Sequence, residues 1–195
     1  MPSIRIENVV ATTALNTDLE LPSVAVMLEN AEYEPEQFPG VVYRIRDPKT
    51  AVLLFRSGKM VCTGAKSVKQ VHHAVEIVVK ELTAAGVKVD PSPEVHVQNI
   101  VASSDLESDL NLNAIAISLG LDRIEYEPEQ FPGLVYRLHD PAVVALLFGS
   151  GKIVCTGAKT VDDLCRAVQR LQEDLGNAGL LRPRGGKLTP PVVLS

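Results

Sequence analysis

The nine residues EYEPEQFPG occupy positions 32–40, and the same nine letters return at positions 125–133. At a constant offset of 93 positions, residues 33–66 and 126–159 are identical at 25 of 34 positions. Earlier in each copy, residues 4–28 align with residues 95–119 at an offset of 91. A repeat of about 90 residues is longer than a solenoid unit of about 20 to 50 residues. The chain therefore contains two domain-sized copies of one module.

The repeat sets the expected domain boundaries. We place the first repeat at residues 1–91 and the second at residues 92–181, with Pro91 and Pro93 marking the junction. Residues 182–195 form a C-terminal tail that we expect to be flexible. No apolar run approaches the roughly 20 residues that a membrane helix needs, and the first residues lack the pattern of a secretion signal. We expect a soluble, cytoplasmic protein without a membrane partner.

The charge and the cysteines restrict the possible functions. The net charge of −5 argues against nucleic acid, because nonspecific DNA binding draws on clustered Lys and Arg. The negative charge is unevenly distributed along the chain. Residues 1–91 hold 10 basic and 11 acidic side chains, whereas residues 92–181 hold 6 basic and 13 acidic side chains. The three cysteines have no CxxC spacing, and Cys62 and Cys155 are repeat partners within apolar segments. We interpret them as reduced core residues and expect neither a metal nor a cofactor.

The apolar pattern of the first repeat predicts four strands and two helices. A short helix follows Leu21-Pro22-Ser23, and a long amphipathic helix spans residues 67–85 and ends at Gly86. The strands are separated by turn sequences such as DPKT and RSGK. We place them at residues 4–13, 41–46, 50–55 and 60–64. The second repeat copies the pattern.

Both faces of the predicted sheet are apolar. Val52 and Leu54 point to one side, and Ala51 and Leu53 point to the other. Two helices per repeat can cover only one side, so the other side should be an exposed apolar surface, which is typical of an interaction site. That surface also carries small neutral polar side chains, namely Asn8, Thr63, Asn99 and Thr156. Their donors match the acceptors of A·T pairs in the DNA minor groove, while nearby aliphatic side chains offer no acceptor to a guanine amino group.

Four motifs occur in the same order in both halves: N-[VI]-V-A, YEPEQFPG, F-x-SGK and VCTGAK. In this order the chain resembles the TATA-binding protein family over about residues 4–181. The resemblance implies an α+β saddle of two pseudo-symmetric repeats. A curved antiparallel sheet of ten strands carries four helices on its convex face and DNA under its concave face. It also implies a transcription initiation factor, not an enzyme, that binds the minor groove of a TATA box and kinks the DNA.

The resemblance assigns roles to individual residues. The phenylalanine wedges that separate base steps fall on Phe38, Phe55, Phe131 and Phe148. The central hydrogen-bonding positions fall on Asn8, Thr63, Asn99 and Thr156. The apolar groove contacts fall on Val10, Pro39, Leu53, Val61, Val101, Pro132, Leu146 and Val154. The phosphate contacts fall on Arg44, Ser57, Lys59, Lys66, Arg137, Ser150, Lys152 and Lys159.

The resemblance also implies protein partners. Within the second stirrup, residues 126–133, the segment 126–130 matches the family surface that receives transcription factor B, which then recruits RNA polymerase. The residues assigned to this surface are Tyr126, Glu127, Glu129 and Gln130. Acidity, a short N-terminal segment and YEPEQFPG in both halves resemble the archaeal branch, so we expect the protein at the nucleoid.

Two other classes of function would need different residues in this sequence. In a protein-binding module, the apolar face would pair with another chain, or with a second copy as a homodimer when DNA is absent; such a face would tolerate Leu or Met at the Asn and Thr positions. An enzyme would need catalytic groups, and none is evident. GSGK at residues 149–152 lacks the first glycine and the hydroxyl residue of a P-loop, and the acid pairs of the EYEPEQFPG loops flank a turn without a nucleophile.

Overall fold

The computed structural model describes residues 3–120, 122–181 and 192–194, and the chain divides into two compact units. Residues 8–98 form the first-repeat unit. Residues 1–7 together with residues 99–195 form the second-repeat unit. The first strand of each repeat therefore begins in one unit and continues in the other.

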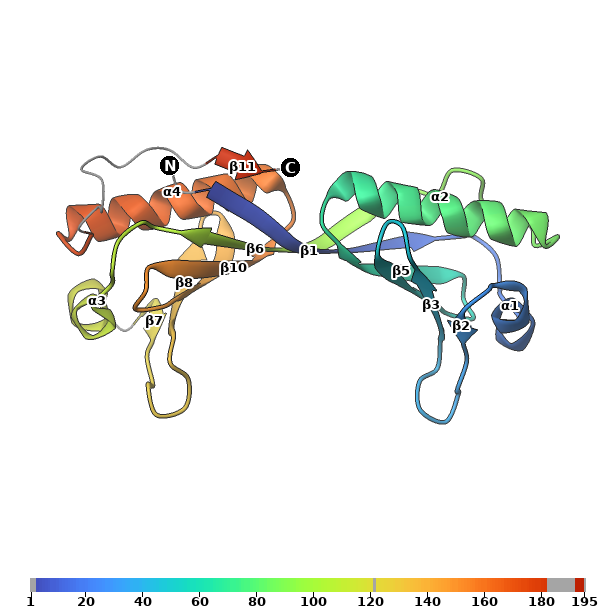
Figure 1. Cartoon of the computed structure of the whole chain (residues 1–195), viewed down its shortest axis with the longest axis horizontal. Coiled ribbons are helices and arrows are strands. Elements are labelled where there is room, and N and C mark those ends of the chain that lie inside the picture. Colours follow the sequence, from blue (N-terminus) through green and yellow to red (C-terminus); the bar gives the residue numbers. More distant parts are fainter. Residues whose placement is uncertain (1–2, 121, 182–191, 195) are drawn as a thin grey trace. The chain divides into compact units, whose positions relative to one another are not determined.

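The first-repeat unit contains an antiparallel sheet in the order β2-β3-β4-β5-β1, with α2 packed on β5. Figure 1 shows α2 lying along one side of these strands, and α1 beyond the end of the sheet. The elements are β1 (Ser3–Ala14), α1 (Leu21–Met27), β2 (Ala31–Glu32), β3 (Val41–Ile45), β4 (Thr50–Leu54), β5 (Lys59–Ala65) and α2 (Val68–Ala84).

The second-repeat unit repeats this arrangement in the order β6-β10-β9-β8-β7, with α4 packed on β10 and β9. Its elements are β6 (His96–Asp105), α3 (Leu112–Leu119), β7 (Ile124–Glu125), β8 (Leu134–His139), β9 (Ala142–Leu147), β10 (Lys152–Ala158) and α4 (Val161–Asn177). A further strand, β11 (Val192–Leu194), pairs in parallel with Ser3–Arg5 of β1. The rest of the tail that we expect to be flexible, 182–191 and 195, lies outside the described residues.

The two long helices begin and end where their sequences predict. Ser67 Oγ accepts a hydrogen bond from the Gln70 amide at 3.1 Å, and Thr160 Oγ1 accepts one from Asp163 at 3.1 Å. These caps satisfy amide groups that have no partner within the helix. Each helix is also joined to the buried side of its sheet, because Tyr43 donates to Glu81 and Tyr136 donates to Asp174, both at 2.8 Å.

Burial along the strands shows which face of each sheet the helices cover. Val52 and Leu54 of β4 have no exposed surface, whereas Ala51 and Leu53, which alternate with them, are partly exposed. The expected alternation is therefore correct, and each unit has one apolar face toward its helix. We call the opposite face, which is apolar as well, the uncovered face.

The predicted fold class is confirmed: the fold is α+β, and the described residues form ten antiparallel strands and four helices in two repeats. The four strands and the long helix expected in the first repeat lie within one residue of their predicted bounds, whereas α1 begins at Leu21, ahead of its expected start after Ser23. Residue patterns alone missed β2, β7 and β11. Strands of two or three residues are too short to show a period of two, so only their partners define them.

Candidate nucleic-acid interface

A row of side chains crosses the uncovered face of the first-repeat unit. Backbone pairing places Val42 beside Leu53, Leu53 beside Val61, and Val61 beside Thr12. The second-repeat unit has the matching row Val135, Leu146, Val154 and Ser103. All eight side chains are partly exposed. The predicted groove contacts Val10 and Val101 are also partly exposed and lie on strands of the same sheets.

Next to this row, an asparagine amide is held in one orientation in each unit. The Gly64 amide donates to Asn8 Oδ1 at 2.7 Å, and Asn8 Nδ2 donates to Thr63 Oγ1 at 3.3 Å. In the second-repeat unit, Gly157 donates to Asn99 at 2.7 Å, and Asn99 donates to Thr156 at 3.1 Å. A backbone N–H can only donate, so it must face the amide oxygen, which leaves the nitrogen on the other side.

These contacts depend on an irregular strand at the glycines. Gly64 and Gly157 have φ angles of +89° and +99°, a region that side chains with a Cβ rarely adopt. At the same places the registers of β1 with β5 and of β10 with β6 shift. The bulge turns the glycine N–H toward the asparagine oxygen instead of toward a neighbouring strand.

Each unit carries one pair of the predicted phenylalanine wedges. Phe38 and Phe55 meet edge to face with ring centroids 5.7 Å apart, and Phe131 and Phe148 do so at 5.9 Å. The rings rest against a glycine backbone. A Cβ at Gly40 would lie 2.9 Å from Phe38, and one at Gly133 would lie 2.6 Å from Phe131.

The wedges come from two different loops of each repeat. Phe38 donates its amide to the Glu34 carbonyl at 2.9 Å within the first stirrup, residues 33–40. Phe55 begins the RSGK turn, where its amide donates to the Lys59 carbonyl at 3.0 Å. Residues 131 and 148 have the same contacts in the second-repeat unit, with Glu127 and Lys152. Thus the structure brings together two residues that lie 17 positions apart in the sequence.

Most of the predicted phosphate contacts are exposed on these strands and turns. Arg44 pairs with Glu32 at 3.1 Å, and Arg137 pairs with Glu125 at 3.1 Å. Exposed pairs of this kind contribute about 0 to 1 kcal/mol, so a phosphate can replace the carboxylate at little cost. The other predicted contacts are also exposed: Ser57, Lys59, Lys66, Ser150, Lys152 and Lys159.

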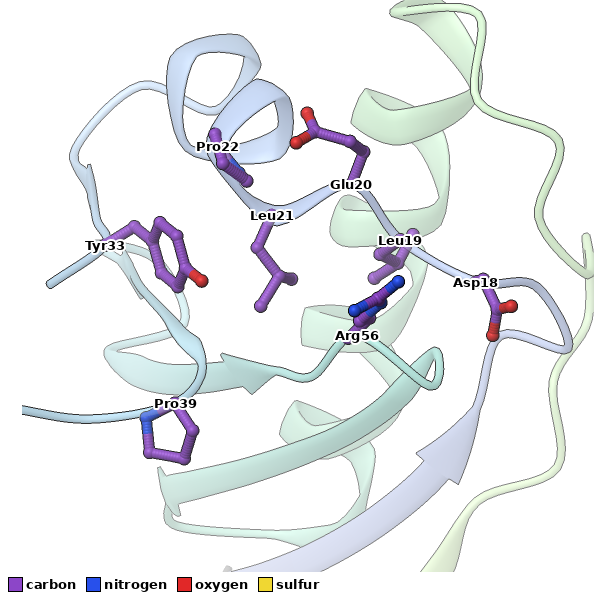
Figure 2. Close-up of a pocket in the computed structure, with 8 residues that line it drawn as sticks. All are labelled: Asp18, Leu19, Glu20, Leu21, Pro22, Tyr33, Pro39 and Arg56. Carbon is purple, nitrogen blue, oxygen red and sulfur yellow. The ribbon is translucent and has the colours of Figure 1, made fainter. Parts of the chain in front are cut away.

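A pocket of about 540 Å³ lies at the base of the first stirrup. Figure 2 shows Tyr33 and Arg56 on either side of Leu21, with Pro39 below them. Pro39, predicted as a groove contact, therefore also lines this pocket. The residue that corresponds to Arg56 in the second repeat is Gly149, so the two stirrups differ in charge at their bases.

The predicted partner surface lies on the second stirrup. Glu127, Glu129 and Gln130 are exposed, and Tyr126 is partly exposed. The Glu127 carbonyl accepts hydrogen bonds from the Gln130 amide at 3.0 Å and the Phe131 amide at 2.9 Å. These bonds join the stirrup backbone to the position of a predicted wedge.

Four polar residues of the uncovered faces were not assigned to the interface from the sequence alone. Ser103 Oγ donates to Glu7 Oε1 at 2.6 Å, and Gln98 Nε2 donates to Thr12 Oγ1 at 3.0 Å. Thr12 and Ser103 alternate with buried residues, which is a signal that the sequence does contain. Their partners come from the strand of the other repeat, about 90 residues away, and no local pattern indicates this.

The cysteines are consistent with core packing. Cys62 and Cys155 are buried, and burial raises the pKa of their thiols to about 11 and about 12. Within the described ranges, no three His, Cys, Asp or Glu side chains are placed to hold a metal ion. None of the described helices is long and apolar enough to cross a membrane.

Comparison with known proteins gives one consistent result. Residues 3–85 and 94–178 match the family model described as transcription factor TFIID, or TATA-binding protein. The chain is 62% identical to the TATA-box-binding protein of Haloarcula marismortui over 179 residues, which is 92% of this chain and 96% of the relative. It is 56% identical to the TATA-box-binding protein of Thermoplasma volcanium over 178 residues, or 91% and 97% of the two chains.

The fold agrees with a solved structure. The TATA-binding protein of Methanococcus jannaschii superposes with a TM-score of 0.82 at 51% identity, covering 90% of this chain and 99% of that one. The duplicated motifs, the five-stranded repeats and these relatives all point to the same family. The chain therefore belongs to the TATA-binding protein family in its archaeal form, a family of DNA-binding transcription factors and not of enzymes.

Proposed function

We propose that this chain is a general transcription initiation factor that binds the minor groove of a TATA box with the uncovered faces of both units. The four phenylalanines kink the DNA, and the bound protein nucleates assembly with transcription factor B and RNA polymerase. Its place of action is the cytoplasm, at the nucleoid.

The observation that carries this proposal is the fixed asparagine amide in each unit. Because Gly64 and Gly157 hold the oxygens of Asn8 and Asn99, the amide nitrogens serve as donors. Each nitrogen has two hydrogens, so one remains for a ligand after the contact with threonine. The minor groove of A·T pairs presents only acceptors, adenine N3 and thymine O2, which suits such donors.

The aliphatic rows support the same specificity. Val61 and Leu53 in one unit, like Val154 and Leu146 in the other, have no acceptor for the amino group that guanine adds to the minor groove. A G·C pair beneath them would leave that donor desolvated without a partner. Burying a donor without a partner costs more free energy than a matched contact contributes, so the aliphatic rows reject a G·C pair more strongly than they select an A·T pair.

The phenylalanine pairs support kinking. Each pair is apolar, at least partly exposed, and mounted on a glycine backbone that leaves no room for a side chain. Separating a base step costs a few kcal/mol, and insertion of an apolar ring offsets this by removing the ring from water. Two pairs, one in each unit, suit two kinks in one site.

The acidic second stirrup supports a protein partner. Glu127 and Glu129 are exposed beside the predicted wedge Phe131. Residues 92–181 hold 13 acidic against 6 basic side chains. Complementary charge on a partner increases the association rate and selects one orientation. We therefore assign this stirrup to transcription factor B.

A bending assay with three duplexes tests the DNA part of the proposal. Fluorophores at the two ends of a short duplex report affinity and bend for a TATA site, a G·C-substituted site and an I·C-substituted site. We expect tight binding to TATA, a loss of about 1 to 3 kcal/mol for each G·C pair beneath the aliphatic rows, and much smaller losses for I·C. Inosine changes the major-groove edge but lacks the minor-groove amino group, so strong loss with I·C would contradict minor-groove recognition.

A further inference from the structure

The uncovered faces of the two units carry different side chains at one equivalent position. In the second-repeat unit, Ser103 donates to Glu7 at 2.6 Å; at the equivalent place in the first-repeat unit, Gln98 donates to Thr12 at 3.0 Å. Glu7 aligns with Gln98, and Ser103 aligns with Thr12. The same position therefore holds a carboxylate in one unit and an amide in the other.

Strand pairing places both sites on the uncovered faces. Ser103 lies opposite Val154 of β10, and Thr12 lies opposite Val61 of β5. Glu7 and Asn8 are partly exposed between the buried residues Ile6 and Val9. Thus Glu7 and Gln98 each extend the row of side chains that the proposed function assigns to the minor groove.

The chemistry of the two groups is opposite toward the minor groove. A carboxylate can accept about four hydrogen bonds and donates none, and Ser103 donates one of those that Glu7 accepts. Gln98 Nε2 donates to Thr12 Oγ1 at 3.0 Å and, over the long distance of 3.5 Å, to the His96 carbonyl, so a closer acceptor such as adenine N3 or thymine O2 can replace the second contact. Adenine N3 and thymine O2 repel a carboxylate, because all of these groups are acceptors. The guanine amino group, by contrast, can donate a hydrogen bond to a carboxylate.

The neighbouring residues strengthen the difference. Asp105 of β6 is partly exposed and alternates with the buried Ser104 on the same face as Ser103, and its repeat partner is Ala14. The second-repeat unit therefore has two carboxylates on strands β1 and β6 where the first-repeat unit has none.

We propose that Glu7 is a specificity-determining residue that lets the second-repeat unit tolerate a guanine amino group in its half of the site. The first-repeat unit, with Gln98 at the matching place, requires A·T throughout its half. This inference rests on the proposed function, since it needs binding in the minor groove. On a site with guanine in only one half, the protein places Glu7 over that guanine.

A substitution scan tests the difference in tolerance. Each A·T pair of the site is replaced in turn by G·C or by I·C, and affinities are measured for the parent, Glu7→Gln and Gln98→Glu. For the parent we expect at least one G·C position with less than about a threefold loss, against about tenfold or more elsewhere. Glu7→Gln restores the full loss at that position, and Gln98→Glu creates a second tolerant position. Equal G·C losses in all three proteins would overturn the inference.

The double variant Glu7→Gln with Gln98→Glu is the matched control, because it keeps the net charge and the composition. On a site with one guanine, a DNA-cleaving reagent is attached to a cysteine that replaces Glu34, with the native cysteines removed. We expect one-sided cutting by the parent background and cutting on the opposite side by the double variant. Unchanged polarity would count against Glu7.

The outcomes separate this inference from the proposed function. If no variant binds the all-A·T duplex more tightly than the G·C-substituted one, minor-groove recognition itself fails. If all variants bind the A·T and I·C duplexes tightly but show the same loss with guanine everywhere, only the role of Glu7 fails.

Discussion

The first-repeat and second-repeat units have the same residues where packing or backbone conformation allows only one residue type. They differ where side chains face solvent. Gly40 and Gly133 both lie against a phenylalanine pair, and Gly64 and Gly157 both orient an asparagine. The helices, by contrast, have unlike exposed faces: α4 begins with Asp162 and Asp163, whereas no acidic residue lies in the first turn of α2. Packing and hydrogen bonding thus keep the two uncovered faces nearly the same. The helix surfaces that face solvent differ in charge, so a partner can bind one unit in preference to the other.

The largest expected effect comes from removing one phenylalanine pair. Phe131→Ala with Phe148→Ala should lower DNA affinity about 100-fold and reduce the bend, because a few kcal/mol of unstacking then lack an apolar group to offset them. Phe38→Ala with Phe55→Ala should do the same from the other unit. Both are measured with the end-labelled duplex.

The matched controls for this experiment are Val26→Ala and Ile117→Ala, exposed apolar residues at equivalent places on α1 and α3. They should leave bending unchanged. A double phenylalanine variant that bends DNA as the parent does would show that the wedge assignment is wrong.

The next effect concerns the fixed amides. Asn8→Leu and Asn99→Leu should each weaken binding to a TATA duplex about tenfold, since A·T acceptors then face an apolar group without a donor. Sedimentation of the DNA-free variants provides a second measurement. Undiminished DNA binding together with stronger self-association would favour the protein-binding alternative, in which the uncovered face pairs two copies.

Alkaline pH should reduce stability through the two buried cysteines, Cys62 and Cys155. Burial raises the pKa of Cys62 to about 11 and that of Cys155 to about 12, so both thiols stay protonated in the folded state above pH 9, where the unfolded state releases protons. Their contribution is complete below pH 9 and is lost as the pH rises toward 11 or 12. Above pH 9, the unfolding free energy should fall by about 1 kcal/mol per cysteine for each pH unit.

Denaturant titrations at pH 8 and about pH 9.5 check this slope before most tyrosine of the unfolded state ionises. Tyr43, whose pKa burial and Glu81 raise to about 12, adds a loss of the same sign once the pH approaches the ordinary tyrosine value of 10.0. In Cys62→Ala with Cys155→Ala, the loss of unfolding free energy between the two pH values should be smaller than in the parent. An undiminished loss in that variant would assign the slope to other groups.

The smallest effect compares the two stirrups. Glu127→Lys with Glu129→Lys should weaken the ternary complex with transcription factor B about fivefold, because exposed charge pairs contribute up to about 1 kcal/mol. DNA binding alone should not weaken. The equivalent change in the first stirrup, Glu34→Lys with Glu36→Lys, is the control and should spare the ternary complex. Equal losses from both stirrups would contradict the assignment.

Much of this protein follows from the sequence by itself. The duplicated motifs determine two repeats, and the alternation in segments such as residues 50–55 determines which side chains face the helices. The positions of the asparagines and phenylalanines follow from the same alternation together with the family resemblance. The type of each element and the direction of its side chains depend on residues within a few positions, because local backbone geometry sets the period of two in a strand and of 3.6 in a helix. A local sequence pattern therefore predicts them.

Only the tertiary structure decided how distant residues meet. The orientation of Asn8 depends on Gly64, the packing of Phe38 depends on Phe55 and Gly40, and the difference between Glu7 and Gln98 depends on Ser103 and Thr12. Strand β11 likewise exists because it pairs with Ser3–Arg5, not because of its own three residues. A period of two specifies the side to which a residue points, but register and partner are set by contacts between segments far apart in the chain.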